Sequence, residues 1–195
     1  MVIKFTAKKP EDEEGVEKPD PVLPGALVWP HHARIWADID NFARMAGVTK
    51  NWIVNGADDH LTPDEIDWVK KFKQHENGGM LFVGQQEDTD PKLNAITGML
   101  TRNFLHARVM TVQAFAMEVE SGEVPNETCV LVSNLYLAKG TIPQWKVGLV
   151  MDGLQSRLLT GKRTVLAGSD MSMLKAEYGA QFHRWLEMNF DIKEV

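Results

Sequence analysis

The sequence predicts an α/β domain in which a mostly parallel sheet is covered by helices on both faces. Short apolar runs alternate with longer segments whose apolar residues recur at helical spacing, and this alternation is typical of strands joined by right-handed helical crossovers. The apolar runs are nearly uninterrupted, as in Thr128–Ser133 (TCVLVS), which is expected of strands buried on both faces. With 195 residues, the chain is long enough for one domain with a sizeable core.

The amino-terminal part is predicted to be less regular than the rest. Residues 1–24 are rich in charge and proline and offer little apolar surface, so we expect a flexible arm. Residues 25–59 are expected to form a helical or irregular extension, with one helix over Ala33–Met45, where Ile35, Ile39 and Phe42 fall near one face. The α/β core is then expected over residues 60–195.

The core is predicted to begin with a helix capped by Thr62. Pro63 suits the first helical position, and Glu65 completes a capping box with Thr62. Glycines at 78 and 79 end this helix. The remaining elements alternate. Strands are expected at about 79–83, 107–112, 128–133, 163–168 and 190–195, and helices at about 91–104, 113–120, 143–160, 171–177 and 180–188.

The turn after the first strand, residues 84–91 (GQQEDTDP), is the most informative segment. A helix is expected to start near Pro91 with Asp90 as its cap. Strand, glycine turn and helix form the layout in which phosphate-binding loops of the pattern G-x-x-x-x-G-K-[ST] occur. Counted from Gly84, the second glycine is replaced by Thr89, the lysine by Asp90 and the hydroxyl residue by Pro91.

Three acids in this turn argue against phosphate binding: Glu87, Asp88 and Asp90. A phosphate-binding loop uses backbone N–H groups, a lysine charge and a helix N-terminus. Acidic side chains repel phosphate, and Pro91 removes one N–H donor. The sequence therefore predicts that nucleotide chemistry at this turn is lost.

The stretch from Trp145 to Phe190 is distinctive in its order. A long helix starts at Trp145, a strand follows over 163–168, and a short helix ends in Tyr178-Gly179 before a final helix. In this order and spacing, residues from about 79 to 195 resemble the AAA+ core of bacterial replicative-helicase loaders of the DnaC/DnaI type and the related IstB-type transposition ATPases. The resemblance implies a P-loop NTPase core of the AAA+/RecA-like kind.

The resemblance also implies functional positions that this chain does not fill. The family carries adjacent carboxylates after the third strand, where they hold Mg²⁺ and activate water. The matching residues here are Ser133 and Asn134, which cannot do either. A polar sensor residue would fall near Ser169, and the family's arginine at or next to Arg184. We therefore expect a degenerate nucleotide site with no catalytic residue, cofactor or metal ligand. As an interface, this site would comprise Gly84, Glu87, Asp88, Asp90, Ser133, Asn134, Ser169 and Arg184.

These features favour a catalytically inactive, AAA+-like binding or assembly protein of DNA replication or mobile-element systems. Its partner would be a replicative helicase, an AAA+ subunit or a second copy of itself. The alternative is a metal-dependent enzyme that acts on a phosphorylated substrate. Its site would lie where the strands of a doubly wound sheet end, around Gly84–Asp90, Ser133–Asn134 and Gly168–Asp170.

The charge pattern adds only weak support for nucleic-acid binding. The net charge of −6 argues against bulk attraction to nucleic acid or an anionic membrane. The best basic cluster is a candidate for contacting nucleic-acid phosphates, although basic residues at a helix end also suit the helix dipole; it comprises Arg157, Lys162 and Arg163. The single cysteine, Cys129, excludes an intrachain disulfide and fits a cytoplasmic setting. No apolar stretch approaches the ~20 residues that span a bilayer.

Overall fold

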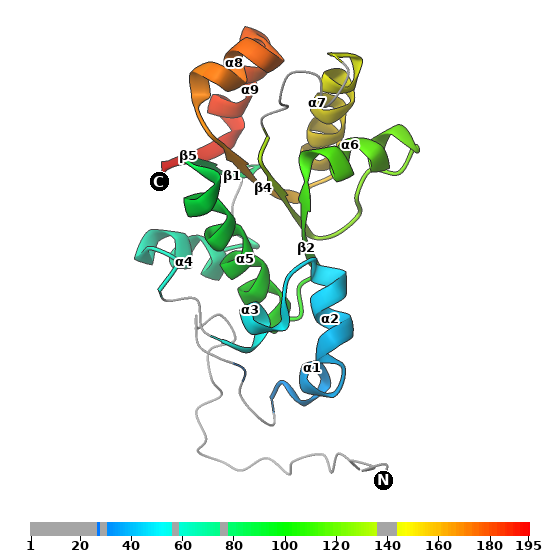
Figure 1. Ribbon diagram of the computed structural model, residues 1–195, viewed down its shortest axis with the longest axis vertical. Helices are drawn as coiled ribbons and strands as arrows, with labels where there is room; N and C mark the ends of the chain where they lie inside the picture. The colour runs from blue at the N-terminus through cyan, green and yellow to red at the C-terminus, as the bar shows by residue number, and fades with distance from the viewer. Residues whose placement is uncertain (1–26, 28–30, 56–58, 75–77, 136–143) are drawn as a thin grey trace.

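The computed structural model describes residues 27, 31–55, 59–74, 78–135 and 144–195, and the arm expected over residues 1–24 lies outside this part. Five parallel strands form one sheet in the order β2-β3-β4-β1-β5 (Figure 1). The strands are β1 (Gly79–Val83), β2 (Ala107–Thr111), β3 (Cys129–Ser133), β4 (Arg163–Gly168) and β5 (Phe190–Glu194). The predicted parallel sheet is confirmed.

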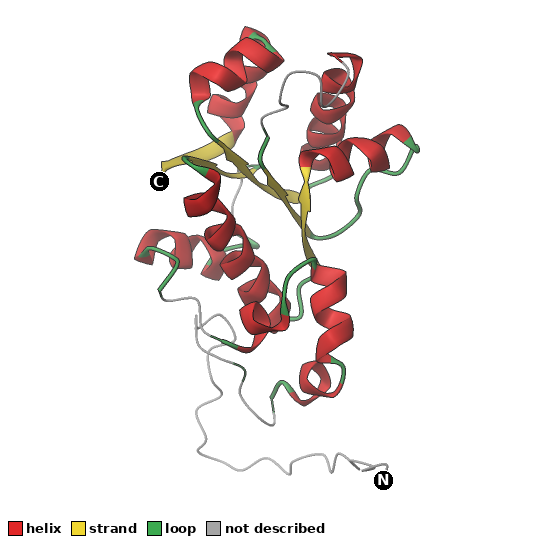
Figure 2. Cartoon of the chain, in the orientation of Figure 1, coloured by secondary structure: helices red, strands yellow, loops and turns green. Residues whose placement is uncertain are grey.

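Helices cover both faces of this sheet, as Figure 2 shows in red on either side of the yellow strands. One face packs against α4 (Pro63–Lys70) and α5 (Gln86–Arg102). The opposite face packs against α6 (Val112–Glu120), α7 (Gln144–Leu159), α8 (Met171–Tyr178) and α9 (Ala180–Asn189). The sheet thus separates two hydrophobic clusters, which explains why β1 and β3 are almost entirely apolar.

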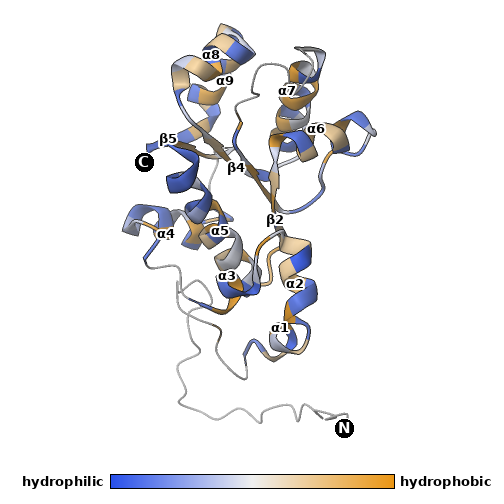
Figure 3. Ribbon diagram, in the orientation of Figure 1, coloured by the Kyte–Doolittle hydropathy of each residue, from blue (hydrophilic) through white to orange (hydrophobic). Residues whose placement is uncertain are grey.

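The third strand illustrates this division. Val130 and Val132 belong to the cluster under α6 to α9, whereas Cys129 and Leu131 belong to the cluster under α4 and α5. Successive side chains of a strand point to opposite faces, so a strand buried on both faces needs apolar residues throughout. In Figure 3 the sheet is correspondingly hydrophobic, while the first turns of α5 are hydrophilic.

The start of α4 confirms the predicted capping box. Thr62 Oγ1 accepts from the backbone N–H of Glu65 at 3.4 Å, and the Glu65 carboxylate accepts from the backbone N–H of Thr62 at 2.7 Å. The same carboxylate, almost fully buried, lies 2.8 Å from Lys92 Nζ on α5. This cap therefore also connects α4 to the longest helix of the described chain.

The amino-terminal extension differs from the single helix expected over Ala33–Met45. Two helices form instead, α1 (Ala33–Ala37) and α2 (Ile39–Ala46), because Asp38 leaves the helical conformation at φ −141° and ψ 40°. A third helix, α3 (Lys50–Val54), was not expected.

The contact between α3 and α5 depends on two residues of α5. Arg102 donates to the backbone oxygens of Trp52, Ile53 and Asn55, which satisfies carbonyls at the end of α3. At Gly98 a Cβ would collide with the Trp52 carbonyl oxygen, so glycine permits the two backbones to approach. Tertiary packing, rather than helical propensity, explains why so short a helix as α3 forms.

The strands predicted at 79–83 and 163–168 are confirmed at both ends. From β2 onwards, every predicted element begins and ends within one residue of its observed bounds. Two helices of the core differ from the prediction: α4 ends at Lys70 and not at the glycines 78 and 79, and α5 spans Gln86–Arg102 where about 91–104 was expected. None of the helices in the described ranges is both long and apolar enough to cross a bilayer.

Candidate functional site

The carboxyl ends of the strands bring together the three segments that the sequence placed there. Val83, the last residue of β1, lies beside Gly168 at the end of β4. Ser133, the last residue of β3, lies beside Thr111 at the end of β2. All five strands are parallel, so Gly84, Asn134 and Ser169 follow at the same end of the sheet. This arrangement confirms that the segments converge.

The turn between β1 and α5 is much shorter than a phosphate-binding loop. Only Gly84 and Gln85 separate strand from helix. The Gly84 N–H donates to Gly168 O at 3.0 Å, and a Cβ on Gly84 would lie 2.7 Å from Val195 O. Glycine is therefore required here by close packing against the neighbouring strands. The backbone leaves no extended loop that could wrap around a phosphate group.

The expectation that the helix starts near Pro91, with Asp90 as its cap, is wrong. Helix α5 begins at Gln86, and Pro91 lies inside it. Proline favours the first helical position, which made Pro91 resemble a start signal. Two effects favour the earlier start: Glu87 and Asp88 suit the positive end of the helix dipole, and Thr89 packs into the interior at 2% exposure.

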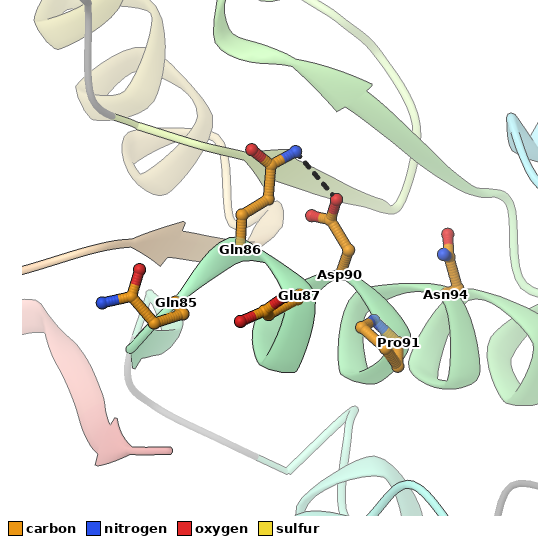
Figure 4. A pocket seen from close by; sticks show the side chains of 6 residues that line it. All are labelled: Gln85, Gln86, Glu87, Asp90, Pro91 and Asn94. Atoms are coloured by element: carbon orange, nitrogen blue, oxygen red, sulfur yellow. Dashed lines mark hydrogen bonds between the residues drawn. The ribbon is translucent and has the colours of Figure 1, made fainter.

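The acids of the turn are therefore helical residues. Glu87 and Asp88 are exposed in the first turn, and the Asp90 carboxylate accepts from Gln86 Nε2 at 2.9 Å. An open pocket of about 650 Å³ lies along this face of α5, and Figure 4 shows the side chains that line it. It is lined by Gln85, Gln86, Glu87, Asp90, Pro91 and Asn94. This lining offers amides and carboxylates but no cationic side chain for a phosphate.

The amides of this pocket were not predicted from the sequence. Gln86, Asp90 and Asn94 are spaced four residues apart, so they share one face of a helix. That spacing is informative only once the helix is known to include Gln86. With the start placed at Pro91, Gln85 and Gln86 belonged to a loop.

The described residues at the end of β3, Ser133 to Leu135, carry no charge and are fixed by hydrogen bonds of Leu135. Ser133 is buried at 9% exposure, and Asn134 adopts a left-handed φ of 48°, which asparagine tolerates well. The next residue, Leu135, donates its N–H to Ala167 O at 2.7 Å and accepts from the Tyr178 hydroxyl at 2.6 Å. Burial raises the pKa of Tyr178, so its phenol remains a donor. Neither Ser133 nor Asn134 offers a carboxylate to a metal ion.

The segment after β4 uses its acid to cap a helix. Asp170 accepts from the N–H groups of Ser172 at 2.5 Å and Met173 at 3.2 Å. Hydrogen bonds from the Ser172 side chain and backbone, together with that from Met173, lower the pKa of Asp170. Ser169 beside it is half-buried, and Arg184 is exposed on α9. In the described ranges, no group of three or more His, Cys, Asp or Glu side chains is placed to hold a metal ion.

Comparisons with known proteins place this geometry in a fold family. No protein-family model and no curated protein matches the chain. Among solved structures, a DNA replication initiation factor aligns with a TM-score of 0.57 and 10% identity over 71% of this chain. The chain spans about half of that protein's length, 48%.

Two smaller proteins are matched over nearly their whole length. A putative primosome component from Streptococcus pyogenes serotype M3 aligns with a TM-score of 0.56 and 10% identity, over 81% of this chain and 96% of that one. The DnaC helicase loader aligns with a TM-score of 0.52 and 10% identity, over 71% of this chain and 95% of that one. The chain has the AAA+ P-loop NTPase fold. At these identities the likeness establishes the fold alone.

Within the AAA+ fold, the basic cluster lies at the opposite end of the sheet from the site. Arg163 is the first residue of β4, and Lys162 donates to Asn126 O at 2.8 Å. Arg157 is fully buried, so its interpretation as a nucleic-acid contact is wrong. Its guanidinium donates to Pro125 O, Glu127 O, Arg163 O and Thr164 Oγ1. This arginine connects the amino ends of β3 and β4 and is not available to a phosphate.

Proposed function

We propose that this protein is a catalytically inactive AAA+-type binding or assembly protein of DNA replication or mobile-element systems. Its partner is a replicative helicase, an AAA+ subunit or a second copy of itself. The observation that carries the proposal is the junction of β1 and α5, where helix α5 begins two residues after Gly84 and places Glu87 and Asp88 in its first turn.

The chemistry of this junction supports the loss of nucleotide binding. A phosphate bound at a helix N-terminus needs free N–H groups and a positive field. Here the first turn carries two exposed carboxylates, those of Glu87 and Asp88, and no lysine or arginine. The exposed acids add negative charge at the same place, so the attraction for phosphate is reduced.

The end of β3 supports the same proposal independently. Hydrolysis in an AAA+ site requires carboxylates that position Mg²⁺ and water. The structure holds neutral Ser133 and Asn134 at this point. The alternative of a metal-dependent enzyme gains no support from the described residues, because no three potential ligands gather there.

The solved structures support a role in replication as an inference from fold. They include a DNA replication initiation factor, a putative primosome component and the DnaC helicase loader. In the proposed role, the negative charge of Glu87 and Asp88 replaces that of a nucleotide phosphate and attracts an arginine of the partner. Arginine pairs with carboxylates through charge-assisted hydrogen bonds.

Nucleotide binding is the first test of this proposal. Thermal unfolding is followed with ATP or ADP and Mg²⁺, because a ligand at ~100 times its dissociation constant adds about 2.7 kcal/mol to stability. We expect no shift at millimolar nucleotide, with a helicase loader that retains its phosphate-binding loop as the positive control. A clear shift would contradict the proposal.

Neutralising the acids tests the binding surface. We expect Glu87→Gln/Asp88→Asn/Asp90→Asn to weaken binding to a replicative helicase in analytical ultracentrifugation while the monomer stays folded. The control Asp40→Asn/Glu123→Gln/Asp152→Asn removes the same charge from exposed sites on other elements and should bind as the wild type. Equal helicase binding by both variants would contradict the proposal that Glu87, Asp88 and Asp90 form the binding surface.

A further inference from the structure

The strand at one side of the sheet, β5, leaves half of its backbone hydrogen-bonding groups facing outwards. It pairs with β1, and among the residues that the structure describes no strand lies beyond it (Figure 1). Unpaired strand edges are templates for pairing with another chain. The identity of the outward-facing residues therefore decides what could pair there.

Hydrogen bonds at both ends of β5 identify those residues. Asn189 O accepts from Gly78 N at 2.8 Å, and Val195 N donates to Val83 O at 2.9 Å. The N–H and C=O of one strand residue point to the same side, and the side alternates along the strand. Asp191 and Lys193 therefore direct their backbone groups to β1. Phe190, Ile192 and Glu194 direct theirs outwards, and these outward groups are called the outer margin of β5.

The sequence of β5 (FDIKE) is complementary to itself in antiparallel orientation. If Ile192 lies opposite its own copy on a two-fold axis, Asp191 lies opposite Lys193 of the second copy, and Lys193 lies opposite Asp191. Both cross-strand pairs then join opposite charges. Opposite charges stabilise directly opposed positions, whereas like charges destabilise them.

The backbone geometry fits this register. With Ile192 on the axis, the outward groups of Ile192 meet each other, and those of Phe190 meet those of Glu194. These become hydrogen-bonded pairs, so Asp191 and Lys193 form the non-hydrogen-bonded pairs, in which side chains approach more closely. Within one chain Lys193 Nζ lies 4.0 Å from Asp191 Oδ2, and both side chains are partly exposed. They are thus available to a second copy.

We propose that two copies of this protein pair through the outer margin of β5, antiparallel with Ile192 on the two-fold axis, which joins their sheets into one. This interface goes beyond the proposed function and does not depend on it, since it uses the side of the sheet and not the first turns of α5. An isologous contact of this kind closes on itself and yields a dimer.

Charge exchange tests both the partner and the register. Asp191→Lys places two lysines opposite two lysines, and Lys193→Asp places two aspartates opposite two aspartates. We expect either variant alone to raise the dimer dissociation constant at least about tenfold, or about 1.4 kcal/mol. Mixing the two variants restores opposite charges at both pairs, so a heterodimer of wild-type affinity is expected. The double variant Asp191→Lys/Lys193→Asp should also dimerise.

A backbone variant tests the strand pairing itself. The Ile192 N–H faces outwards, so Ile192→Pro removes an intermolecular donor without removing a hydrogen bond to β1. We expect a folded monomer from this variant and a dimer from the control Ile192→Val. The measurement is sedimentation velocity over a concentration series up to millimolar, with thermal unfolding to confirm that each variant folds.

A wild type that stays monomeric at millimolar concentration would overturn the inference, as would a dimer that is insensitive to the charge and proline variants. The variant Glu87→Gln/Asp88→Asn/Asp90→Asn should still form the β5 dimer, whether or not it binds a helicase. Failure of this inference and failure of the proposed function are therefore distinguishable.

Discussion

The two ends of the sheet use charge in opposite ways. At the amino end, Arg157 is fully buried and donates to four oxygens from the chain around β3 and β4. At the carboxyl end, Glu87 and Asp88 are exposed on the first turn of α5. A buried and fully bonded charge is part of the scaffold, because removing it leaves polar groups unsatisfied. An exposed charge is available for recognition.

The same contrast distinguishes the two surfaces that the sequence offered for binding, the basic cluster and the acidic turn. The basic cluster that resembled a phosphate contact belongs to the scaffold end. The acidic turn belongs to the end where ligands bind in parallel α/β sheets. The difference teaches that burial decides which of these charges a partner can reach: Arg157 is enclosed, whereas Glu87 and Asp88 are exposed.

Thiol reactivity should separate the two ends most widely. Cys129 starts β3 at the amino end, is fully buried, and has a pKa raised by burial to about 12. We expect Cys129 to react with a thiol reagent only when the protein unfolds. Because the unfolded fraction is about 10⁻³ or less, its reaction should be at least ~1,000-fold slower than that of an exposed thiol. A Cys129→Ala/Ser169→Cys variant, with its thiol half-buried at the carboxyl end, should react without unfolding. Similar rates for the two proteins would break the comparison.

Removing the buried arginine is expected to cost the most stability. In Arg157→Met the buried carbonyl oxygens of Pro125 and Glu127 lose this donor while remaining in the interior, and the partly buried Arg163 O loses it as well. We expect a loss of about 3 kcal/mol in urea unfolding. The control Arg184→Met changes an exposed arginine on α9 and should stay within about 0.5 kcal/mol of the wild type. Equal effects of the two variants would contradict a structural role for Arg157.

Neutralising the carboxyl-end acids should affect stability far less. Glu87→Gln and Asp88→Asn each remove a favourable interaction with the helix dipole, worth about 0.5 kcal/mol at low ionic strength. Salt screens this interaction, so the loss should shrink in concentrated sodium chloride. Urea unfolding at low and high salt measures both effects. A loss comparable to that of Arg157→Met would mean that these acids are scaffold residues after all.

The smallest effect is a pH dependence at Asp170. Its pKa in the folded state lies below the ordinary value of 3.8. The stability that the Asp170 cap contributes is therefore fully present above pH 3.8. It is lost as the pH falls below 3.8 through the pKa of the folded state. The stability difference between wild type and Asp170→Ala should narrow in that range.

A second variant isolates the cause of this shift. The Ser172 side chain makes the largest contribution to lowering the pKa of Asp170, so Ser172→Ala should move that pKa upwards in an NMR titration. The difference between wild type and Arg157→Met should not narrow over the same range, because a guanidinium does not titrate there. An unchanged Asp170 pKa in Ser172→Ala would show that the cap hydrogen bonds have little influence.

Local patterns predicted most of the core. The capping box at Thr62 and the apolar run Val165–Ala167 of β4 depend on residues that are neighbours in sequence. Local patterns failed at Pro91, which resembles a helix start. The helix instead begins at Gln86, because the acids Glu87 and Asp88 favour the first turn, and Pro91 lies inside α5. They failed again at Asp38, where the expected helix is interrupted.

The candidate site also has features that the sequence determined and features that only the tertiary structure decided. The sequence alone determined that Ser133 and Asn134 offer no carboxylate, and that residues 84–91 carry three acids and no lysine. It also determined the parallel sheet, because strand and helix periods are local properties of the chain. Only the tertiary structure decided that Arg157 is buried and that β5 presents Ile192 outwards. Each of these depends on residues distant in sequence, whose contacts no local pattern specifies.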